Sequence, residues 1–346
     1  LCYKKLSMSK KNSSVILKRG FKDFEDLSQV YLNFKTKLDK LKKKIFLIAI
    51  SGGPDSLALA ALSKAYKYER KVKFNYVLVD HNIRKNSNVE SKQVKNLLKK
   101  HNFSLTILKN KTSIKRNIQS KAREIRYDLI TKYCRKKKIG IILTAHNLED
   151  QVETFFIRLS RGSGLTGLSA MKPLSKLNDK IQLYRPLIET KKKYLIKISK
   201  SIFGKYFKDP SNKDKKYLRT KIRYLKKPLS DSGINYDQII KSIKNLASSR
   251  ETLEIYYKKL FQESVKIRKK EVVIKYKYFN QLNNEIKIKI INDSIKLLKK
   301  NYYNPRSIKV LNLVNNIKNN QFKQSSLGGC IFFVKKDNLC VKAEKY

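Results

Sequence analysis

Short apolar runs alternate with longer amphipathic stretches in the first part of the chain. The apolar runs are typical of buried strands, and they are Ile45–Ile50, Phe74–Val79, Leu105–Leu108 and Ile139–Thr144. Between them, apolar residues recur at helical spacing in Leu57–Tyr68, Val89–His101 and Lys121–Arg135. Strands and helices that alternate in this way indicate an α/β fold, built on a doubly wound and mostly parallel sheet.

The pattern changes after the segment Asp209-Pro-Ser-Asn212. A basic, helix-like stretch runs from Tyr217 to about Leu298, and a further helix-like segment begins at Asn304. Two short strand candidates come last, at Cys330–Val334 and Leu339–Val341. The two strand candidates follow Gly328-Gly329 and predict a small terminal hairpin. We therefore expect a basic N-terminal segment (1–40), an α/β catalytic domain (41–215) and a mostly helical second domain (216–346).

The turn between the first strand and the first helix carries the clearest chemical signal. It reads Ser51-Gly-Gly-Pro-Asp-Ser56, a Gly-Gly turn flanked by hydroxyl groups at the start of a helix. Such a turn presents backbone N–H groups and the positive end of the helix dipole to an anion, and a nucleotide pyrophosphate fits best. The turn contains no Lys, so it is not the G-x-x-x-x-G-K-[ST] phosphate loop. The alternative is an ordinary tight turn that joins a strand to a helix.

Polar residues also follow two other predicted strands, as Asp80-His81 and Ala145-His146. In doubly wound sheets, ligands bind outside the carboxyl ends of the strands. We therefore expect the Ser51–Ser56 turn, His81 and His146 to lie at one edge of the sheet.

Two carboxylates stand at the start of a fourth predicted helix, Glu149–Arg161, which ends at Gly162. Asp150 and Glu153 are three residues apart and share one helix face. Near a nucleotide they could hold Mg²⁺, bind an ammonium group or take a proton from an attacking amine. The alternative is that the helix dipole alone favours acids at this helix start.

Pairs of cations offer candidate nucleic-acid contacts. Arg123 and Arg126 are three residues apart on a predicted helix and could clamp phosphates, although a solvated helix face is the alternative. The stretch Tyr217–Tyr224 interleaves Arg219, Lys221 and Arg223 with aromatic residues, which can hold phosphates and stack bases. Its tyrosines could equally belong to the core.

The net charge points to a polyanionic partner. The 81 Lys and Arg residues exceed the 27 Asp and Glu residues by 54, giving a formal charge of +54. Such a charge favours nucleic acid or another anionic surface. A genome rich in A and T offers an alternative cause, because it favours Lys, Asn, Ile and Tyr codons in any protein.

Several other classes of site and location are not indicated. The segment Gly162–Gly167 matches G-x-G-x-x-G but follows a helix, so it does not predict a dinucleotide site. No cysteine pair has C-x-x-C spacing, and the four cysteines favour free thiols in a reducing cytosol.

No apolar run approaches about 20 residues, so we expect no membrane-spanning helix. Residues 1–20 lack acids and faintly resemble an organelle transit peptide, which makes an organelle stroma the alternative to a cytoplasmic location.

Taken in chain order, these motifs resemble the tRNA(Ile)-lysidine synthetase family, a group of N-type ATP pyrophosphatases whose PP-loop has the form S-G-G-x-D-S. The matching segments are Ser51–Ser56, Val79–Arg84, Ala122–Tyr127, Ala145–Thr154, Arg161–Gly164, Gly167–Met171, Arg185–Leu187 and Asp209–Asn212, followed by Arg219 and Arg223. Two positions depart from the family pattern. Glu149 stands where members usually have Asp, and Asn82 stands where they usually have Gly, although Asn tolerates the left-handed backbone of such a turn.

The resemblance implies a Rossmann-like PP-loop fold and a two-step ligation with ATP and Mg²⁺. ATP would adenylate the ring carbonyl oxygen of the wobble cytidine in the CAU-anticodon isoleucine tRNA and release pyrophosphate. The ε-amino group of free L-lysine would then displace AMP and form lysidine. Adenylation turns a poor leaving oxygen into a good one, and the remaining task is positioning and charge control. The oligomeric state stays undetermined.

The resemblance also implies roles for single residues. The expected ATP-binding residues are Ser51, Gly52, Gly53, Pro54, Asp55, Ser56 and His81, with Asp55 also near Mg²⁺. The expected catalytic residues are Asp55, Asp150, which would activate the lysine amine, and Arg123, which would steady a phosphate or the activated base. Lysine would be bound by Glu153 and His146, and tRNA by Arg126, Arg219 and Arg223.

Two other functions remain open at this point. A tRNA thiolase of the same superfamily would activate a base in the same way, but members that use an iron–sulfur cluster or catalytic cysteines need paired Cys residues. A catalytically silent, basic RNA-binding protein on the same scaffold is the second alternative. The acids Asp55, Asp150 and Glu153 argue against it.

Overall fold

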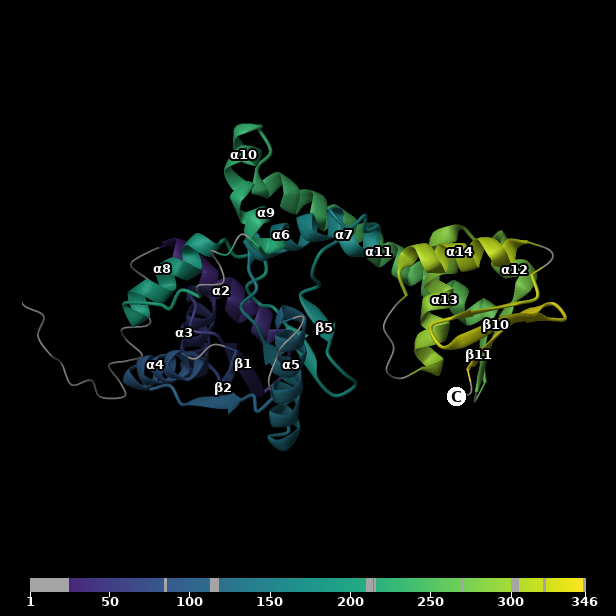
Figure 1. Ribbon diagram of the computed structural model, residues 1–346. Coiled ribbons are helices and arrows are strands. Elements are labelled where there is room, and N and C mark those ends of the chain that lie inside the picture. Colours follow the sequence, from purple (N-terminus) through teal and green to yellow (C-terminus); the bar gives the residue numbers. More distant parts are fainter. Residues whose placement is uncertain are drawn as a thin grey trace, which may run out of the picture. The chain divides into compact units, whose positions relative to one another are not determined.

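The chain divides into two compact units, Leu1–Ala247 (unit 1) and Ser248–Tyr346 (unit 2) (Figure 1). The computed structural model describes residues 25–83, 86–112, 118–209, 214, 216–268, 270–299, 305–319 and 322–344. The stretch that resembles a transit peptide, residues 1–20, lies outside them. Within the described ranges, no helix has the length and apolar character needed to cross a membrane.

Unit 1 is built on a six-stranded sheet, which we call sheet A. Its strands are β1 (Ile45–Ile50), β2 (Lys73–Asp80), β3 (Leu105–Lys109), β4 (Ile141–Leu143), β5 (Leu174–Lys176) and β6 (Gln182–Tyr184), in the order β3-β2-β1-β4-β6-β5. All neighbours pair parallel except β5, which pairs antiparallel with β6 at one edge. The predicted doubly wound, mostly parallel sheet is confirmed. Strands β5 and β6 were not predicted, because three residues each are too few to show a pattern.

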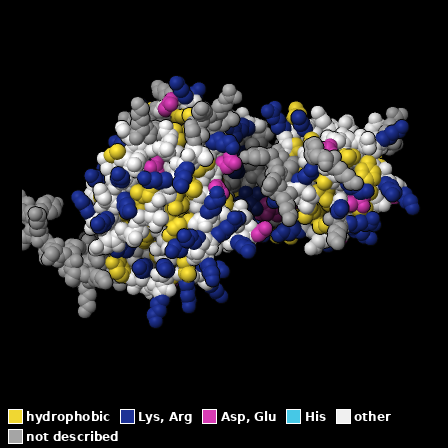
Figure 2. All heavy atoms as spheres, turned by 60° about the horizontal axis from the view of Figure 1, so that its bottom comes forward, with side chains coloured by type: hydrophobic (Ala, Val, Ile, Leu, Met, Phe, Trp, Pro, Cys, Tyr) yellow, Lys and Arg dark blue, Asp and Glu magenta, His cyan; other side chains and the backbone are white. Residues whose placement is uncertain are grey.

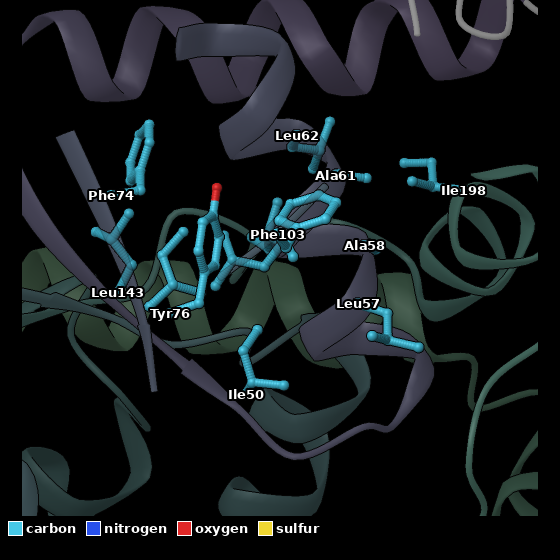
Figure 3. Close-up of a cluster of buried hydrophobic side chains, with 14 of the residues drawn as sticks. Ile50, Leu57, Ala58, Ala61, Leu62, Phe74, Tyr76, Phe103, Leu143 and Ile198 are labelled. Atoms are coloured by element: carbon cyan, nitrogen blue, oxygen red, sulfur yellow. The ribbon is translucent and has the colours of Figure 1, made fainter. Parts of the chain in front are cut away.

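Helices cover both faces of sheet A. One face carries α2 (Glu25–Asp39), α3 (Pro54–Glu69), α4 (Ser87–Lys100) and α8 (Lys192–Phe203), and the other carries α5 (Ile118–Lys136). The alternation along β1 explains this arrangement, since Phe46 and Ile48 pack in the first layer while Leu47 packs in the second. Figure 3 shows the first layer, where Ile50 and Tyr76 of the sheet face α3. Each large apolar side chain buried there contributes about 1.5–3 kcal/mol.

Part of the expected N-terminal segment belongs to this core. Helix α2 begins at Glu25, and its Leu27, Phe34 and Leu38 are buried in the same cluster as β1 and α3. Residues 25–39 are therefore an integral layer of unit 1.

A further group of helices follows β4 and extends unit 1 beyond the expected boundary at residue 215. They are α6 (Leu148–Leu159), α7 (Leu165–Leu168), α9 (Leu218–Tyr224), α10 (Lys226–Asp231) and the start of α11 (Tyr236–Ser264). Leu148 and Val152 of α6 pack against Ile239 and Ile243 of α11, and this contact keeps the chain within unit 1 as far as Ala247. The G-x-G-x-x-G segment, Gly162–Gly167, follows α6 and continues into α7, so it lies after a helix, as the sequence indicated.

Unit 2 combines helices with a five-stranded antiparallel sheet. Its strands are β7 (Val265–Arg268), β8 (Glu271–Lys275), β9 (Gln324–Leu327), β10 (Cys330–Lys335) and β11 (Asn338–Ala343), and its helices are α12 (Tyr276–Gln281), α13 (Asn284–Leu298) and α14 (Ser307–Lys318). The predicted terminal hairpin is confirmed as β10–β11. The helix-like stretch expected from Tyr217 to about Leu298 also contains the strands β7 and β8, which were not predicted. Val272, Val273 and Ile274 are all buried there, and β8 pairs antiparallel with β11.

Lys and Arg side chains are distributed over the surfaces of both units. Figure 2 shows them on each unit's visible face, with only a few acidic side chains between them. This distribution is what a formal charge of +54 requires, because burial of unpaired cations is costly.

Candidate active site

The carboxyl ends of β1, β2 and β4 bring the predicted site residues to one edge of sheet A, which we call the carboxyl edge. The chain runs from β1 outward through β2 to β3 and then crosses to β4 on the other side of β1. The strand order therefore reverses between β1 and β4, where open α/β sheets bind their ligands. The Ser51–Ser56 turn follows β1, and His146 follows β4.

The turn after β1 is braced by its own hydroxyl groups. The backbone N–H and the hydroxyl of Ser51 each lie 3.1 Å from Ser56 Oγ, and Ser56 Oγ donates to Gly53 O at 3.0 Å. Helix α3 begins with Pro54 at its first position, and Gly53 before it provides no side-chain cap. The N–H groups of the first turn of α3 are thus available to an anion, as the sequence indicated.

The two glycines of the turn have different structural roles. Gly52 has a φ of +83°, and a Cβ built there would lie 2.5 Å from Val94 Cγ2 and 3.3 Å from Phe207 Cδ2. Its carbonyl also accepts a hydrogen bond from Phe207 N at 3.0 Å. A Cβ at Gly53 would meet only Ser51 Oγ, at an ordinary 3.5 Å. The fold therefore requires glycine at position 52 and tolerates a larger residue at position 53.

Asp55 is a desolvated carboxylate in the first turn of α3. Its Oδ2 lies 3.6 Å from Lys192 Nζ, while its Oδ1 is buried and has no hydrogen-bond partner among the described residues. Burial raises the pKa of Asp55 to about 6; the Lys192 ammonium opposes this rise and the Asp150 carboxylate adds to it. A buried carboxylate oxygen without a partner suits a hard cation such as Mg²⁺. The described residues contain no cluster of three metal-ligating side chains, so phosphate and water oxygens would have to complete the coordination.

The end of β2 forms a tight polar turn. Asp80 is buried, and its Oδ1 accepts a hydrogen bond from Asn82 N at 3.0 Å. Asn82 has a φ of +52°, which confirms that Asn preserves the left-handed turn expected at this position. Asn110, which follows β3, donates to His81 O at 3.0 Å. Burial, reinforced by Arg126, lowers the pKa of His81, so its imidazole is neutral at physiological pH.

Asn147 and Asp150 form a capping box at the start of α6. Asn147 Oδ1 accepts from Asp150 N at 3.0 Å, and Asp150 Oδ2 accepts from Asn147 N at 3.1 Å. One carboxylate oxygen of Asp150 therefore stabilises the helix start. The other, Oδ1, lies 3.9 Å from Arg219 Nη2. Asp150 thus caps its helix and still directs one oxygen towards a cation.

His146 lies immediately before this capping box. Its Nδ1 is 2.9 Å from the hydroxyl of Thr144. Burial lowers the pKa of His146 to about 4; the Asp150 carboxylate opposes this effect, and the guanidinium groups of Arg185, Arg219 and Arg123 add to it. The side chain is thus a neutral hydrogen-bonding group at physiological pH.

Glu153 and two arginines of α9 form one ion-pair cluster, which we call the α6–α9 cluster. Glu153 is only 3% exposed. Its Oε2 lies 2.7 Å from Arg219 Nε, and its Oε1 accepts from Arg223 Nε at 2.5 Å. The predicted lysine-binding carboxylate and two predicted tRNA-binding arginines are therefore direct partners.

The arginines of α5 lie at the same edge with different exposure. Arg123 is exposed, and its guanidinium lies over the Tyr127 ring, 5.0 Å from the centroid. Burial lowers the pKa of Arg126, and the neighbouring charges of Arg123 and Arg219 lower it further. The site therefore concentrates guanidinium groups, which is typical of a surface for phosphates.

Several contributors to the carboxyl edge were given no role from the sequence, among them Arg185, which was named only within the matching segment Arg185–Leu187. Arg185 is buried, and its Nη1 donates to Lys172 O at 2.8 Å and lies 3.0 Å from Ser175 Oγ. Lys192 and Asn110 were not singled out either. The start of α8 was detectable, because Leu195, Ile198 and Ile202 recur at helical spacing after the lysines. The Asn147 cap was also readable, as Asn followed three residues later by an acid.

Comparisons with known proteins show which sequences this chain is similar to. A family profile described as a PP-loop domain matches residues 27–228. A tRNA(Ile)-lysidine synthase from Wolbachia pipientis wMel is 32% identical over 288 residues, covering 82% of this chain and 67% of that protein. The synthase from Rickettsia felis is 32% identical over 292 residues, covering 82% of this chain and 66% of that protein. The chain thus spans about two thirds of the length of these relatives.

A solved structure supports the fold alone. The U34-tRNA thiolase NcsA from Methanococcus maripaludis, determined with its [4Fe-4S] cluster, superposes with a TM-score of 0.55 at 17% identity. The match covers 64% of this chain and 78% of that protein. The similarity therefore concerns the fold of the matched residues.

Proposed function

The chain belongs to the tRNA(Ile)-lysidine synthase family of PP-loop proteins, and from this premise we propose that it ligates L-lysine to the wobble cytidine of the CAU-anticodon isoleucine tRNA. The reaction consumes ATP and releases pyrophosphate and AMP. The observation that carries this proposal is the meeting of the Ser51–Ser56 turn with Asp150 and Glu153 at the carboxyl edge of sheet A. Such a ligation needs two sites, one that binds the phosphates of ATP and one whose carboxylates bind the lysine amine.

The first step is adenylation of the cytidine. The ring carbonyl oxygen attacks the α-phosphorus of ATP, the bond to the bridging oxygen breaks, and pyrophosphate leaves. The hydroxyl-braced turn and the first N–H groups of α3 hold the phosphates in line for this attack. Arg123 and Arg126 would balance the charge that accumulates on the phosphate oxygens.

Asp55 fits the role of the Mg²⁺ ligand in this step. Its buried Oδ1 has no partner among the described residues, and its partial neutralisation by Lys192 leaves a site for a second cation. A bound Mg²⁺ would stabilise the negative charge of the departing pyrophosphate. Because Asp55 lies in the first turn of α3, a Mg²⁺ that it binds would lie next to the Ser51–Ser56 turn.

The second step is attack by the lysine amine. The amine nitrogen bonds to the ring carbon that carried the carbonyl oxygen, the bond from this carbon to the adenylate oxygen breaks, and AMP leaves. Asp150 accepts the proton that the amine loses, through the oxygen that is not used in the capping box. Glu153 and neutral His146 bind the substrate's cationic and polar groups. Glu153 is already paired with Arg219 and Arg223, so a lysine ammonium has to share or displace one of these arginines.

Arg126, Arg219 and Arg223 supply the tRNA contacts in this proposal. Their concentration beside the acids, and the net charge of +54, support binding of a polyanion. Each phosphate neutralised releases a counterion, so binding should weaken steeply with salt.

The thiolase alternative has no support in the described cysteines. Cys134 is buried in the core between α5 and sheet A, and burial raises the pKa of its thiol to about 12. Cys330 and Cys340 are buried free cysteines of unit 2.

Incorporation of labelled lysine tests the proposed function. The chain is incubated with ATP, Mg²⁺, labelled L-lysine and a transcript of the CAU-anticodon isoleucine tRNA. The expected result is ATP-dependent labelling of this transcript and none of a matched transcript with a GAU anticodon. Absence of labelling, under conditions where the Wolbachia relative labels the same transcript, would overturn the proposal.

A further inference from the structure

Three consecutive lysines at the start of α8 have three different environments. Lys191 Nζ lies 2.9 Å from Asp237 Oδ2 on α11, and Lys193 Nζ lies over the Tyr194 ring at 4.9 Å from its centroid. Lys192 Nζ instead lies 3.6 Å from Asp55 Oδ2 of the turn after β1. Of the three ammonium groups, only that of Lys192 reaches the turn.

Rigid packing holds the start of α8 beside the turn. Leu195, Ile198 and Phe203 of α8 are buried in the cluster that also contains Leu57 and Ala61 of α3. Figure 3 shows Ile198 beside the helix that begins with the turn. The two helices therefore move together, and the position of Lys192 relative to the turn is set by the core.

Glu149 fixes the first residue of α8 directly. Its Oε2 accepts a hydrogen bond from Lys192 N at 2.8 Å, while Lys191 at the N-cap position provides no side-chain cap. Glu149 lies in the first turn of α6, one residue before Asp150. It thereby connects the start of α6, which carries Asp150, to the helix that carries Lys192.

From this geometry we infer that Lys192 contacts the β- and γ-phosphates of ATP and that Glu149 is the positioning residue that holds it there. The inference rests on the proposed ATP site at the turn. The turn itself contains no lysine, and Asp55 adds a negative charge beside it, so phosphate binding requires cations from elsewhere. An ammonium within 4 Å of Asp55 lies close enough to the turn to pair with a phosphate oxygen bound there.

Binding measurements without tRNA test the role of Lys192. The Kd values of ATP and AMP are measured with Mg²⁺ for the full chain and for Lys192→Ala, Lys192→Arg and Lys193→Ala. Loss of a charge-assisted contact predicts a Kd for ATP that rises about tenfold or more in Lys192→Ala. We expect Lys192→Arg to recover part of this loss and Lys193→Ala to match the unaltered chain. AMP lacks the β- and γ-phosphates, so its Kd stays unchanged in all three variants.

Two outcomes would overturn the inference. One is unchanged ATP affinity in Lys192→Ala, and the other is an equal loss for ATP and AMP, which would indicate a distorted turn rather than a lost phosphate contact. The lysine-incorporation assay tests the proposed function separately. A chain that binds ATP in a Lys192-dependent way but never labels the transcript would contradict the ligation and leave the Lys192 contact standing.

A double-mutant cycle tests Glu149. Glu149→Ala should raise the Kd of ATP by about threefold to tenfold, because the start of α8 loses its hydrogen bond. The same change in a Lys192→Ala background should add little, since the effect acts through Lys192. Glu149→Gln keeps an acceptor oxygen and should restore most of the affinity. Additive losses in the double variant would contradict a positioning role.

Discussion

The turn after β1 and the α6–α9 cluster lie at the same edge of sheet A but are held in place by different forces. In the turn, Ser51, Gly53 and Ser56 bond to one another within six residues of chain. In the cluster, Glu153 pairs with Arg219 and Arg223, and Arg223 is 70 residues away in the chain. The turn is a local structure that the backbone dictates. The cluster exists only when α9 packs on α6.

This difference has consequences for each region's response to ligands. A local turn with its own hydrogen bonds is preorganised, so it binds phosphates with little rearrangement. A buried carboxylate held by two arginines is exchangeable, because another cation can replace one of its partners. We therefore expect mutations of the acidic side chain that lies in the turn, Asp55, to affect chemistry more than stability, and mutations in the cluster to affect both.

The largest expected effect is that of Asp55→Asn on adenylation. The amide keeps the shape of the side chain but has no negative charge to bind Mg²⁺ or to neutralise the Lys192 ammonium. Adenylate formation should therefore fall by at least about a hundredfold. tRNA binding should stay nearly unchanged, because the arginines of the site remain. Release of labelled pyrophosphate from ATP measures adenylation, and filter binding measures tRNA affinity. Normal adenylation with lost tRNA binding would show that the role assigned to Asp55 is wrong.

The same variant should also change how the stability of the fold depends on pH. The pKa of Asp55 is raised to about 6, so the folded chain binds a proton more tightly than the unfolded chain. Ionised Asp55 therefore costs stability, and this cost grows as the pH rises from about 4 to about 6. Asp55→Asn should be at least as stable as the unaltered chain at pH 8, and this relative advantage should disappear at pH 4. Denaturant titrations at the two pH values test the sign.

Removal of the charge of Glu153 should have the next largest effect. Glu153→Gln leaves Arg219 and Arg223 without their carboxylate; because these arginine side chains are 43% and 31% exposed, water offsets part of the loss, which should be about 1–2 kcal/mol of unfolding free energy. Glu124→Gln is the matched control, since Glu124 forms an exposed pair with Lys121 and its loss should cost less than about 0.5 kcal/mol. Equal, small losses in both variants would mean that the cluster does not stabilise α9.

The same contrast explains which features the sequence could predict. The turn was readable because Gly52, with its φ of +83°, and Pro54 at the helix start are local requirements of the backbone. The left-handed Asn82 was readable for the same reason. The pairing of Glu153 with Arg223 was not, because neither residue carries a local sign of a partner 70 residues away.

Tertiary packing also decided the features of the fold that were missed. Val272, Val273 and Ile274 form only a short apolar run, and the surrounding basic, helix-like residues obscured this sign of a strand. The end of unit 1 at Ala247 depends on contacts of Ile239 and Ile243 with α6. Such contacts join segments that sequence patterns treat separately.

A pair of glycine variants separates fold from chemistry within the turn. Gly52→Ala places a Cβ 2.5 Å from Val94 Cγ2 at a positive φ, so it should lose about 1–3 kcal/mol of unfolding free energy. Gly53→Ala has an ordinary φ of −72° and no close contact, so its stability should be unchanged. Thermal unfolding compares the two. A destabilised Gly53→Ala would show that the turn is tighter than its hydrogen bonds indicate.

The smallest expected effect concerns His146, which lies between the turn and the cluster. Its pKa is lowered to about 4, so below about pH 6.5 the unfolded chain binds a proton that the folded chain rejects, and stability falls as the pH decreases. His146→Gln removes this penalty while keeping a group that can bond to the Thr144 hydroxyl. The stability difference between the unaltered chain and His146→Gln should therefore shift by about 1 kcal/mol in favour of the variant between pH 7.5 and pH 5.5. A difference that does not change with pH would place His146 in a solvated position and weaken the argument that it binds substrate as a neutral group.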